Sequence, residues 1–368
     1  MIEQASRTAG PRPRRPSAAA AAAGTTAATA AGRLRIDLAL QGGGSHGAFT
    51  WGVLDRLLEE DERLLIEAIS GTSAGAMNAA VLASGFATGG PEGARGALAR
   101  FWKSVSDAAR FSPLQRGPLD ILLGRWTLDS SPAFIAMDLL SRLVSPYDLN
   151  PGGGNPLSAI LAGAIDFAAL AKAPIKVFVT ATNVRTGRGR VFRNADITPE
   201  VLLASACLPF LFQAVEIDGE AYWDGGYSGN PTLTPLMRES EANDMILVAI
   251  NPVERPGIPR TARDILNRLN EISFNSVLIK ELRMMALLRR VIEPGDAESK
   301  RWAQPRMHLI ASPLMVELGY SSKLNAEWAF LEMLRDEGRR AATEFLTVKG
   351  SNLGEQHSID IDVLLDGV

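Results

Sequence analysis

The chain has 368 residues, 46% hydrophobic and 21% charged, with a formal net charge of −3, which excludes a wholly disordered or collagen-like protein. No apolar run reaches the ~18–20 residues of a membrane-spanning helix. Its single cysteine, Cys207, excludes an intrachain disulfide and a cysteine-only zinc cluster.

Residues 1–33 contain five arginines, several prolines and a long alanine run, and they carry a net charge of +4. This low complexity predicts a disordered tail. The alternative is an export signal, but the leucine-type apolar core is missing, so we expect a cytoplasmic protein. The remaining 335 residues carry a charge of −7, which disfavours nucleic acid as a partner.

From residue 35 onwards, strand and helix patterns alternate. Apolar runs at 36–40 and 64–69 predict buried strands, and helical spacing follows each of them at 46–60 and 74–84. This alternation predicts an α/β fold with a central, mostly parallel sheet and helices on both faces.

The rest of the chain adds further elements to this pattern. We expect helices at 94–109, 131–144, 157–171, 199–206, 261–292 and 323–347, and strands at 175–182, 190–193, 245–250 and 307–311. A hairpin is expected at 215–222, turning at Asp218-Gly219. We interpret 34–250 as one α/β domain and 251–368 as a helical elaboration packed on it.

The first chemical motif is the loop Gly42-Gly43-Gly44-Ser45-His46-Gly47, between a predicted strand and a predicted helix. Its glycines let backbone N–H groups approach a ligand closely, and the helix adds its positive N-terminal end. Such a loop suits an anion, which is either a phosphate or a developing oxyanion.

The second motif is Gly71-Thr72-Ser73-Ala74-Gly75, again between a strand and a helix. The G-x-S-x-G pattern in this position predicts a sharp turn that presents the hydroxyl of Ser73. The third motif, Asp224-Gly225-Gly226, follows the hairpin. Taken alone, its Asp-Gly pair is typical of a simple turn.

A serine nucleophile needs a general base, and the chain has only three histidines, His46, His308 and His357. His308 falls in an apolar run that is typical of a core, and His357 lies near a polar terminus. Asp224 needs no histidine if it acts alone, because a dry pocket raises the proton affinity of a carboxylate. A Ser-His-Asp arrangement through His308 remains the alternative.

Together these motifs resemble the patatin-like phospholipase family. The glycine loop, the serine elbow and the Asp-Gly-Gly box match in order, and the segment 204–210 resembles the stretch that precedes the box. The match runs from about residue 36 to 235. One departure is His46, where many members carry lysine or arginine.

The resemblance implies a three-layer α/β enzyme that hydrolyses carboxylic esters of lipids, of phospholipase A or lysophospholipase type, without metal or cofactor. Ser73 attacks the acyl carbonyl and Asp224 accepts its proton. The oxyanion hole is expected from Gly42, Gly43, Gly44 and Ala74. His46, Gly225 and Gly226 are expected to contact the substrate.

Two other interpretations stay open. Gly42, Gly44 and Gly47 also fit a dinucleotide fingerprint, with Glu67 lying 20 positions further on, but this pattern is weak alone. The second interpretation is a non-catalytic scaffold protein, because a chain can keep a fold without keeping the activity.

A lipid or phospholipid substrate makes peripheral membrane contact plausible. The mixed basic and apolar segment 277–292 either lies on a membrane or, as is more common, packs on its own domain. The sequence leaves the oligomeric state open.

Overall fold

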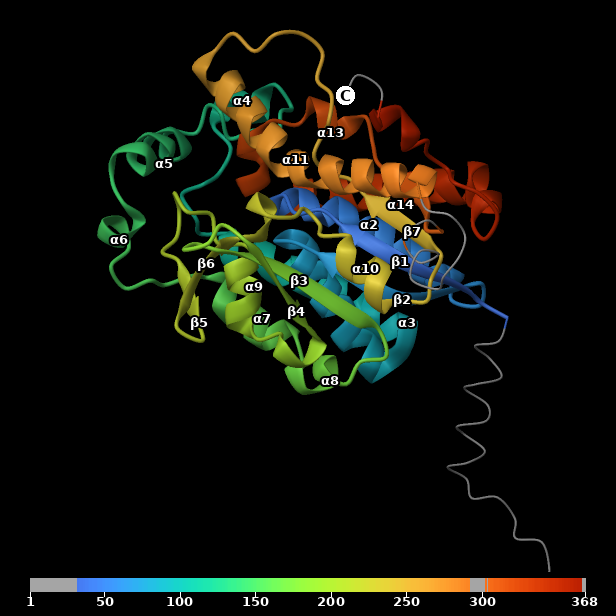
Figure 1. Cartoon of the computed structure of the whole chain (residues 1–368). Coiled ribbons are helices and arrows are strands. Elements are labelled where there is room, and N and C mark those ends of the chain that lie inside the picture. Colours follow the sequence, from blue (N-terminus) through green and yellow to red (C-terminus); the bar gives the residue numbers. More distant parts are fainter. Residues whose placement is uncertain (1–31, 292–301, 303, 366–368) are drawn as a thin grey trace, which may run out of the picture.

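The computed structural model describes residues 32–291, 302 and 304–365 (Figure 1). The predicted tail over 1–33 therefore lies outside the described residues, except for its last two positions. The first secondary-structure element of the described residues is a strand that begins at Leu34, immediately after that tail.

One mixed sheet forms the centre of the molecule. Its strands are β1 (Leu34–Leu40), β2 (Leu64–Gly71), β3 (Lys176–Asn183), β4 (Gly189–Arg193), β5 (Val215–Ile217), β6 (Glu220–Asp224), β7 (Asp244–Val248) and β8 (Arg306–Ile310). The order is β5-β6-β3-β2-β1-β7-β8, with β4 also paired to β3. The neighbouring strands β3, β2, β1, β7 and β8 pair in parallel. The strands β4, β5 and β6 take part only in antiparallel pairs.

Side chains alternate along the strands and so divide the core into two layers. In β1, Ile36, Leu38 and Leu40 join one apolar cluster, whereas Ala39 joins the other. β7 repeats this pattern with Ile246 and Val248 against Met245 and Leu247. Both faces of the sheet are therefore apolar, which requires helices on each side.

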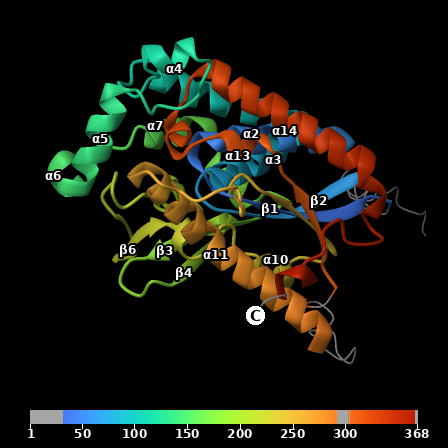
Figure 2. The same cartoon turned by 90° about the horizontal axis from the view of Figure 1, so that it is seen from above.

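Twelve described helices surround the sheet. They are α2 (Gly47–Leu57), α3 (Ala74–Ala109), α4 (Pro118–Leu122), α5 (Pro132–Leu143), α6 (Pro146–Leu149), α7 (Leu157–Ala164), α8 (Phe167–Ala171), α9 (Pro199–Ser205), α10 (Thr234–Glu239), α11 (Ala262–Val291), α13 (Leu314–Glu317) and α14 (Trp328–Val348). α10 and α11 cover one face, and α2, α3 and α14 lie on the opposite face (Figure 2). The predicted fold class is confirmed. Within the described residues, none of these helices combines the length and hydropathy needed to cross a bilayer.

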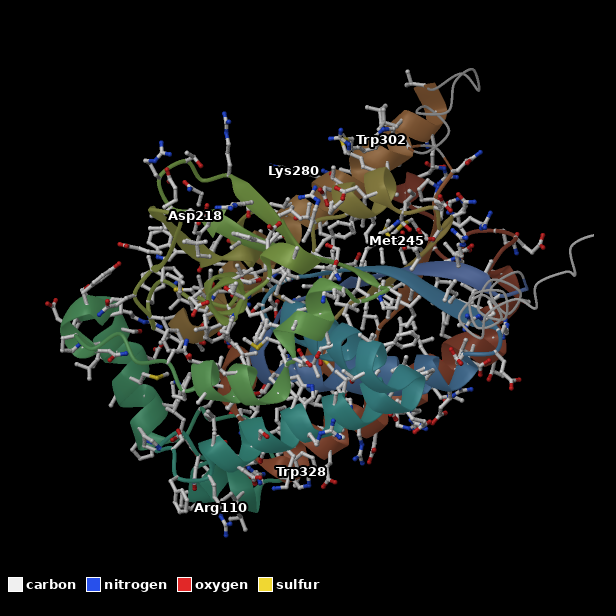
Figure 3. The ribbon with its side chains drawn as sticks, turned by 90° about the horizontal axis from the view of Figure 1, so that it is seen from below. Arg110, Asp218, Met245, Lys280, Trp302 and Trp328 are labelled. Atoms are coloured by element: carbon white, nitrogen blue, oxygen red, sulfur yellow. The ribbon has the colours of Figure 1, made fainter. Side chains whose placement is uncertain are left out.

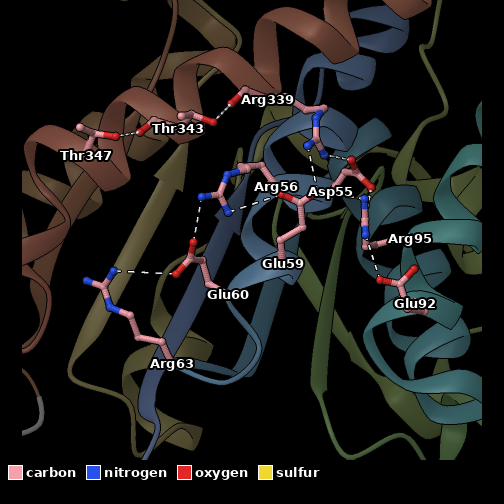
Figure 4. A network of polar contacts seen from close by, with 10 residues as sticks. All are labelled: Asp55, Arg56, Glu59, Glu60, Arg63, Glu92, Arg95, Arg339, Thr343 and Thr347. Atoms are coloured by element: carbon pink, nitrogen blue, oxygen red, sulfur yellow. Dashed lines mark hydrogen bonds and ion pairs between the residues drawn. The ribbon is translucent and has the colours of Figure 1, made fainter.

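The contact between α2 and α14 joins the C-terminal part to the first helix of the chain. A side chain at Gly52 would collide with the carbonyl of Arg335, and one at Gly338 would collide with that of Phe49. Glycine at these two positions therefore allows the backbones to approach closely. At the end of this contact, Arg339 pairs with Asp55 and Glu59 in a wider ionic network (Figure 4).

Three local features refine the predicted elements. The helical patch 157–171 is two helices, because Asp166 caps the second one by accepting a hydrogen bond from the N–H of Ala169. α3 runs on to Ala109, but Gly89 and Gly90 interrupt it with non-helical angles just before Pro91. The hairpin turns at Asp218, labelled in Figure 3, and Gly219, both with positive φ, as a type I′ turn requires.

Candidate active site

A cavity of about 460 Å³ opens beside the carboxyl ends of the central strands, and it brings the three motifs together. Ser73, Asp224, Gly43, Gly44 and Ala74 all line it. In an open α/β sheet this edge is the usual location of ligands, because the loops that follow parallel strands converge there.

The serine elbow adopts a strained turn. Ser73 has φ 54° and ψ −122°, and it separates the end of β2 from the start of α3. A Cβ at Gly71 would lie 2.5 Å from the carbonyl of Gly75, and one at Gly75 would collide with the carbonyl of Leu40. The two glycines of the motif are therefore needed for backbone packing, and this packing holds Ser73 at the tip of the turn.

Asp224 lies at the end of β6 and is almost completely buried. Burial raises its pKa to about 7, while the N–H of Gly226, 2.7 Å from Oδ1, and a hydrogen bond from Ser73 act in the opposite direction. Its backbone N–H donates to the carbonyl of Cys207 at 2.8 Å. A carboxylate held in this way can exchange a proton with the serine near neutral pH.

In the glycine loop, one backbone N–H group is hydrogen-bonded within the protein and two others have no partner among the residues that the structure describes. The N–H of Gly42 donates to Oδ1 of Asn230 at 2.7 Å, and its carbonyl accepts from Nδ2 of Asn251 at 2.7 Å. In the described residues, the N–H groups of Gly43 and Gly44 have no acceptor. Gly42 was expected in the oxyanion hole, but its N–H is already used to hold the loop.

Ala74 occupies the remaining expected position of the hole. It is the first residue of α3, its N–H has no acceptor among the described residues, and it lines the cavity. The first N–H groups of a helix lack intrahelical partners and carry the positive end of the helix dipole. Gly43, Gly44 and Ala74 thus bring unpaired N–H groups to one cavity.

Three residues expected against the substrate do not line this cavity. His46 is buried behind the loop, where its Nε2 lies 2.8 Å from Oγ of Ser322. Burial lowers its pKa well below the usual value of 6.5, so the ring is neutral. Gly225 packs against Thr180, and Gly226 lies against Phe274. The two glycines shape the turn that follows Asp224.

Other residues at the site lie outside the sequence motifs. Oγ of Ser205 accepts from the N–H of Ser73 at 2.9 Å and donates to the carbonyl of Thr180 at 2.7 Å, which fixes the elbow. Asn230 and Asn251 hold the loop, as described above. Lys323 reaches the cavity from the turn Tyr320–Leu324. Only Ser205 lay in a segment that the sequence had singled out.

His308 lies away from the cavity. In β8 its Nε2 is 2.9 Å from Asp244, and its Nδ1 is 2.7 Å from Ser358. Burial by itself would raise the pKa of Asp244, but hydrogen bonds from His308 and Arg306 hold it well below its usual range. The structure therefore gives His308 a role in packing β7, β8 and the C-terminal segment together, rather than in a triad with Ser73.

The structure also disfavours the dinucleotide interpretation, because Glu67 lies away from the glycine loop. Glu67 pairs with Lys176 at 3.0 Å, and its carboxylate accepts from the N–H of Glu241. These contacts lie near the start of β1, whereas the glycine loop follows its end. A Cβ at Gly42 would be 2.6 Å from Cβ of Ser73, so the serine elbow fills the space beside the loop. No cluster of three or more potential metal-ligating side chains occurs in the described part of the chain.

Comparison with known proteins decides the family. A family model described as patatin-like phospholipase matches residues 38–237, which is more than half of the chain. The chain belongs to the patatin-like phospholipase family. This membership assigns it broadly to the lipid acyl hydrolases, and it confirms the resemblance carried by the three motifs.

Other comparisons add less. The crystal structure of VipD from Legionella pneumophila is similar over 83% of this chain and 67% of that one, at 17% identity and a TM-score of 0.34. No curated protein matches the chain. The family assignment of this patatin-like protein therefore rests on residues 38–237.

Proposed function

We propose that this protein hydrolyses carboxylic esters of lipids with Ser73 as nucleophile and Asp224 as general base. One observation carries the proposal: a serine on a strained elbow lines the same cavity as a buried carboxyl group whose pKa is about 7, and this serine is among the groups that act on that pKa. A general base is most effective when its pKa lies near the working pH.

The reaction divides into two steps. In the first, Oγ of Ser73 attacks the acyl carbonyl, Asp224 takes the hydroxyl proton, and the alcohol leaves with that proton. In the second, water attacks the acyl-enzyme, Asp224 accepts a proton from it, and Oγ of Ser73 is reprotonated as the fatty acid departs. The N–H groups of Gly43, Gly44 and Ala74 stabilise the oxyanion in both steps.

The cavity lining suits an acyl chain. Side chains that line it include Met77, Phe134, Met137, Leu208 and Phe212. Burial of apolar surface favours binding by ~25 cal/mol per Å², so a long chain gains more than a short one. We therefore assign the activity to the phospholipase A or lysophospholipase type.

The test uses wild type, Ser73→Ala and Asp224→Ala incubated with a mixed lipid extract, with products identified by mass spectrometry. Wild type should release free fatty acid, and both variants should release none. A fluorophosphonate probe should label wild type at Ser73 only. An unlabelled, inactive but folded wild type would favour the scaffold interpretation.

We also propose that a face built by α4–α6 rests on the bilayer that supplies the substrate. These helices form a group beside the body of the molecule (Figures 1 and 2). The face is defined by exposed apolar side chains: Leu119, Ile121, Leu122, Leu123, Ile135, Leu139, Leu140, Leu143, Tyr147 and Leu149. An apolar patch of this kind on a surface marks an interaction site.

Continuity with the cavity supports the bilayer as the occupant of this face. One side of α5 lines the cavity through Phe134, Met137 and Ser141, and its other side belongs to the exposed face. Residues 110–150 contain four arginines and four aspartates, so apolar burial rather than charge would drive binding. Of the two interpretations of the segment 277–292, packing on its own domain fits the described residues 277–291, where Leu278 and Leu282 join the apolar cluster on the sheet.

Vesicle binding tests this face. A variant carrying Leu122→Ser, Leu139→Ser and Leu143→Ser should lose sedimentation with phosphatidylcholine vesicles. Val348→Ser, which changes an equally exposed residue on α14, should not. Unchanged sedimentation of the triple variant would contradict the assignment. A dimer that the triple variant dissociates would assign the face to a second copy of the chain instead.

We propose, finally, that residues 34–250 form the catalytic domain and that 251–368 pack on it as part of the same unit. β8 pairs with β7 and so extends the same sheet, and α14 packs on α2.

A further inference from the structure

A lysine far from the motifs reaches the cavity. Lys323 belongs to the 3-10 turn Tyr320–Leu324, between β8 and α14. It lines the cavity together with Ser73 and Asp224. The mechanism proposed above does not use it.

The ammonium group has no carboxylate partner. Its Nζ donates to Oδ1 of Asn251 at 2.7 Å, and no ion pair joins it to any described residue. The nearby carboxylate of Glu271 is occupied by Arg255 at 2.7 Å and Arg268 at 3.3 Å. Two of the three N–H bonds of Lys323 are therefore free to meet a ligand. An unpaired cation in a dry site is costly unless an anion joins it.

Lys323 is also tied to the glycine loop. Asn251 accepts from its Nζ and donates to the carbonyl of Gly42, so one amide connects the ammonium group to the loop. The carbonyl of Lys323 packs so closely on Gly44 that a Cβ there would collide with it. Behind the loop, His46 holds the same turn through Ser322.

We propose that the ammonium group of Lys323 stabilises the negative charge that forms on the acyl oxygen above Gly43 and Gly44. This role rests on the Ser73–Asp224 mechanism proposed above. The ammonium group and the unpaired N–H groups come from different parts of the chain, and in this proposal both act on the same acyl oxygen. Electrostatic stabilisation of this kind is strong in a site from which water is excluded.

The charges around Lys323 give the role a signature in pH. Burial lowers the pKa of Lys323 to about 8, and that of Asp224 is about 7. Activity requires Asp224 without its proton and Lys323 with its proton, so kcat/KM should be bell-shaped with a maximum between pH 7 and 8. The other titratable or charged groups that act on Lys323 or surround it are Glu271, Arg255, His46 and Tyr320.

The experiment compares Lys323→Met with Lys323→Arg. Lys280→Met is the control, because Lys280 is an exposed lysine on α11 (Figure 3). Each protein is assayed from pH 5.5 to 9.5 on p-nitrophenyl butyrate, which has no phosphate, and on lysophosphatidylcholine. Circular dichroism verifies that each variant folds.

Lys323→Met should lower kcat/KM about 10²-fold on both substrates and remove the basic limb of the pH profile. Lys323→Arg should recover most of the activity and move the basic limb to higher pH, because a guanidinium keeps its proton. The control should match wild type. Unchanged activity in Lys323→Met would overturn the proposal. A loss confined to lysophosphatidylcholine would also overturn it and would assign the lysine to the phosphate.

A binding measurement separates this proposal from the proposed function. In the Ser73→Ala background, calorimetry at pH 6, where Asp224 is protonated, measures the affinity for dodecanoate. Lys323→Met should weaken binding at least tenfold, and an unchanged affinity would overturn the role of Lys323 whether or not the enzyme is active. Absence of Ser73-dependent hydrolysis in wild type would instead count against the proposed function.

Discussion

Replacing Asp224 with asparagine should abolish activity and stabilise the fold. The pKa of about 7 lies roughly three pH units above the value of 3.8 for an ordinary aspartate. The folded protein therefore binds one more proton than the unfolded chain between about pH 4 and 7, and its free energy of unfolding falls as pH rises through that window. At ~1.36 kcal/mol per pH unit, the loss amounts to about 4 kcal/mol by pH 8.

Asparagine removes this cost because it has no proton to lose. Its amide keeps the shape of the carboxyl group, and its oxygen can still accept from the N–H of Gly226. Relative to wild type, the Asp224→Asn variant should be more stable by only about 1 kcal/mol at pH 4.5 and by up to about 4 kcal/mol at pH 8.

Urea unfolding of both proteins at half-unit pH steps measures this difference in the free energy of unfolding. Other titratable groups contribute equally to both proteins, so their contributions cancel in the difference. A constant difference across the range would refute the reasoning, because it would mean that Asp224 titrates alike in the folded and unfolded chain. Greater stability at pH 8 together with lost esterase activity would show that the carboxylate is kept at a cost to the fold.

Three further changes test the framework of the site. Gly75→Ala should lower the free energy of unfolding by roughly 3 kcal/mol, because its Cβ meets the carbonyl of Leu40, whereas Gly152→Ala, with open space around it, should be neutral in thermal melts. Asn230→Ala should lower the free energy of unfolding by about 1–3 kcal/mol, since the buried N–H of Gly42 loses its acceptor, and should also cut kcat per folded molecule about 10²-fold; a twofold effect on kcat would argue against loop positioning. His308→Ala should cost about 3 kcal/mol of stability, because Asp244 loses a buried partner, and yet keep kcat/KM per folded molecule; a large loss of kcat/KM would point to a triad.

Local sequence patterns predicted the frame of this site well. The apolar runs located β1 and β2, and the turn at Asp218-Gly219 appeared as expected, because each depends on residues that are close in sequence. The serine elbow was predictable for the same reason: Gly71 and Gly75 are needed by the backbone that they themselves form.

Features that depend on distant partners were not predictable. Nothing near Gly42 indicates that its N–H is taken by Asn230, 188 positions further on. His46 was expected against the substrate because it lies beside the loop, but its side chain turns to the core side and meets Ser322. Helical periodicity at 157–171 likewise gave no sign that Asp166 would cap a second helix, since a capping side chain adds no apolar signal.

The proposed active site contains two charges that burial disfavours, and each makes the other less costly. The pKa of Asp224 is raised and that of Lys323 is lowered by the same dry surroundings, while the charge of each favours the ionised form of the other. The carboxylate comes from the segment that matches the family, and the ammonium from a turn after residue 250. Burial raises the pKa of Asp224, and the charge of Lys323 is one of the contributions that lower it, so the part of the chain after residue 250 acts on the electrostatics of the proposed base and is more than a passive addition to the sheet.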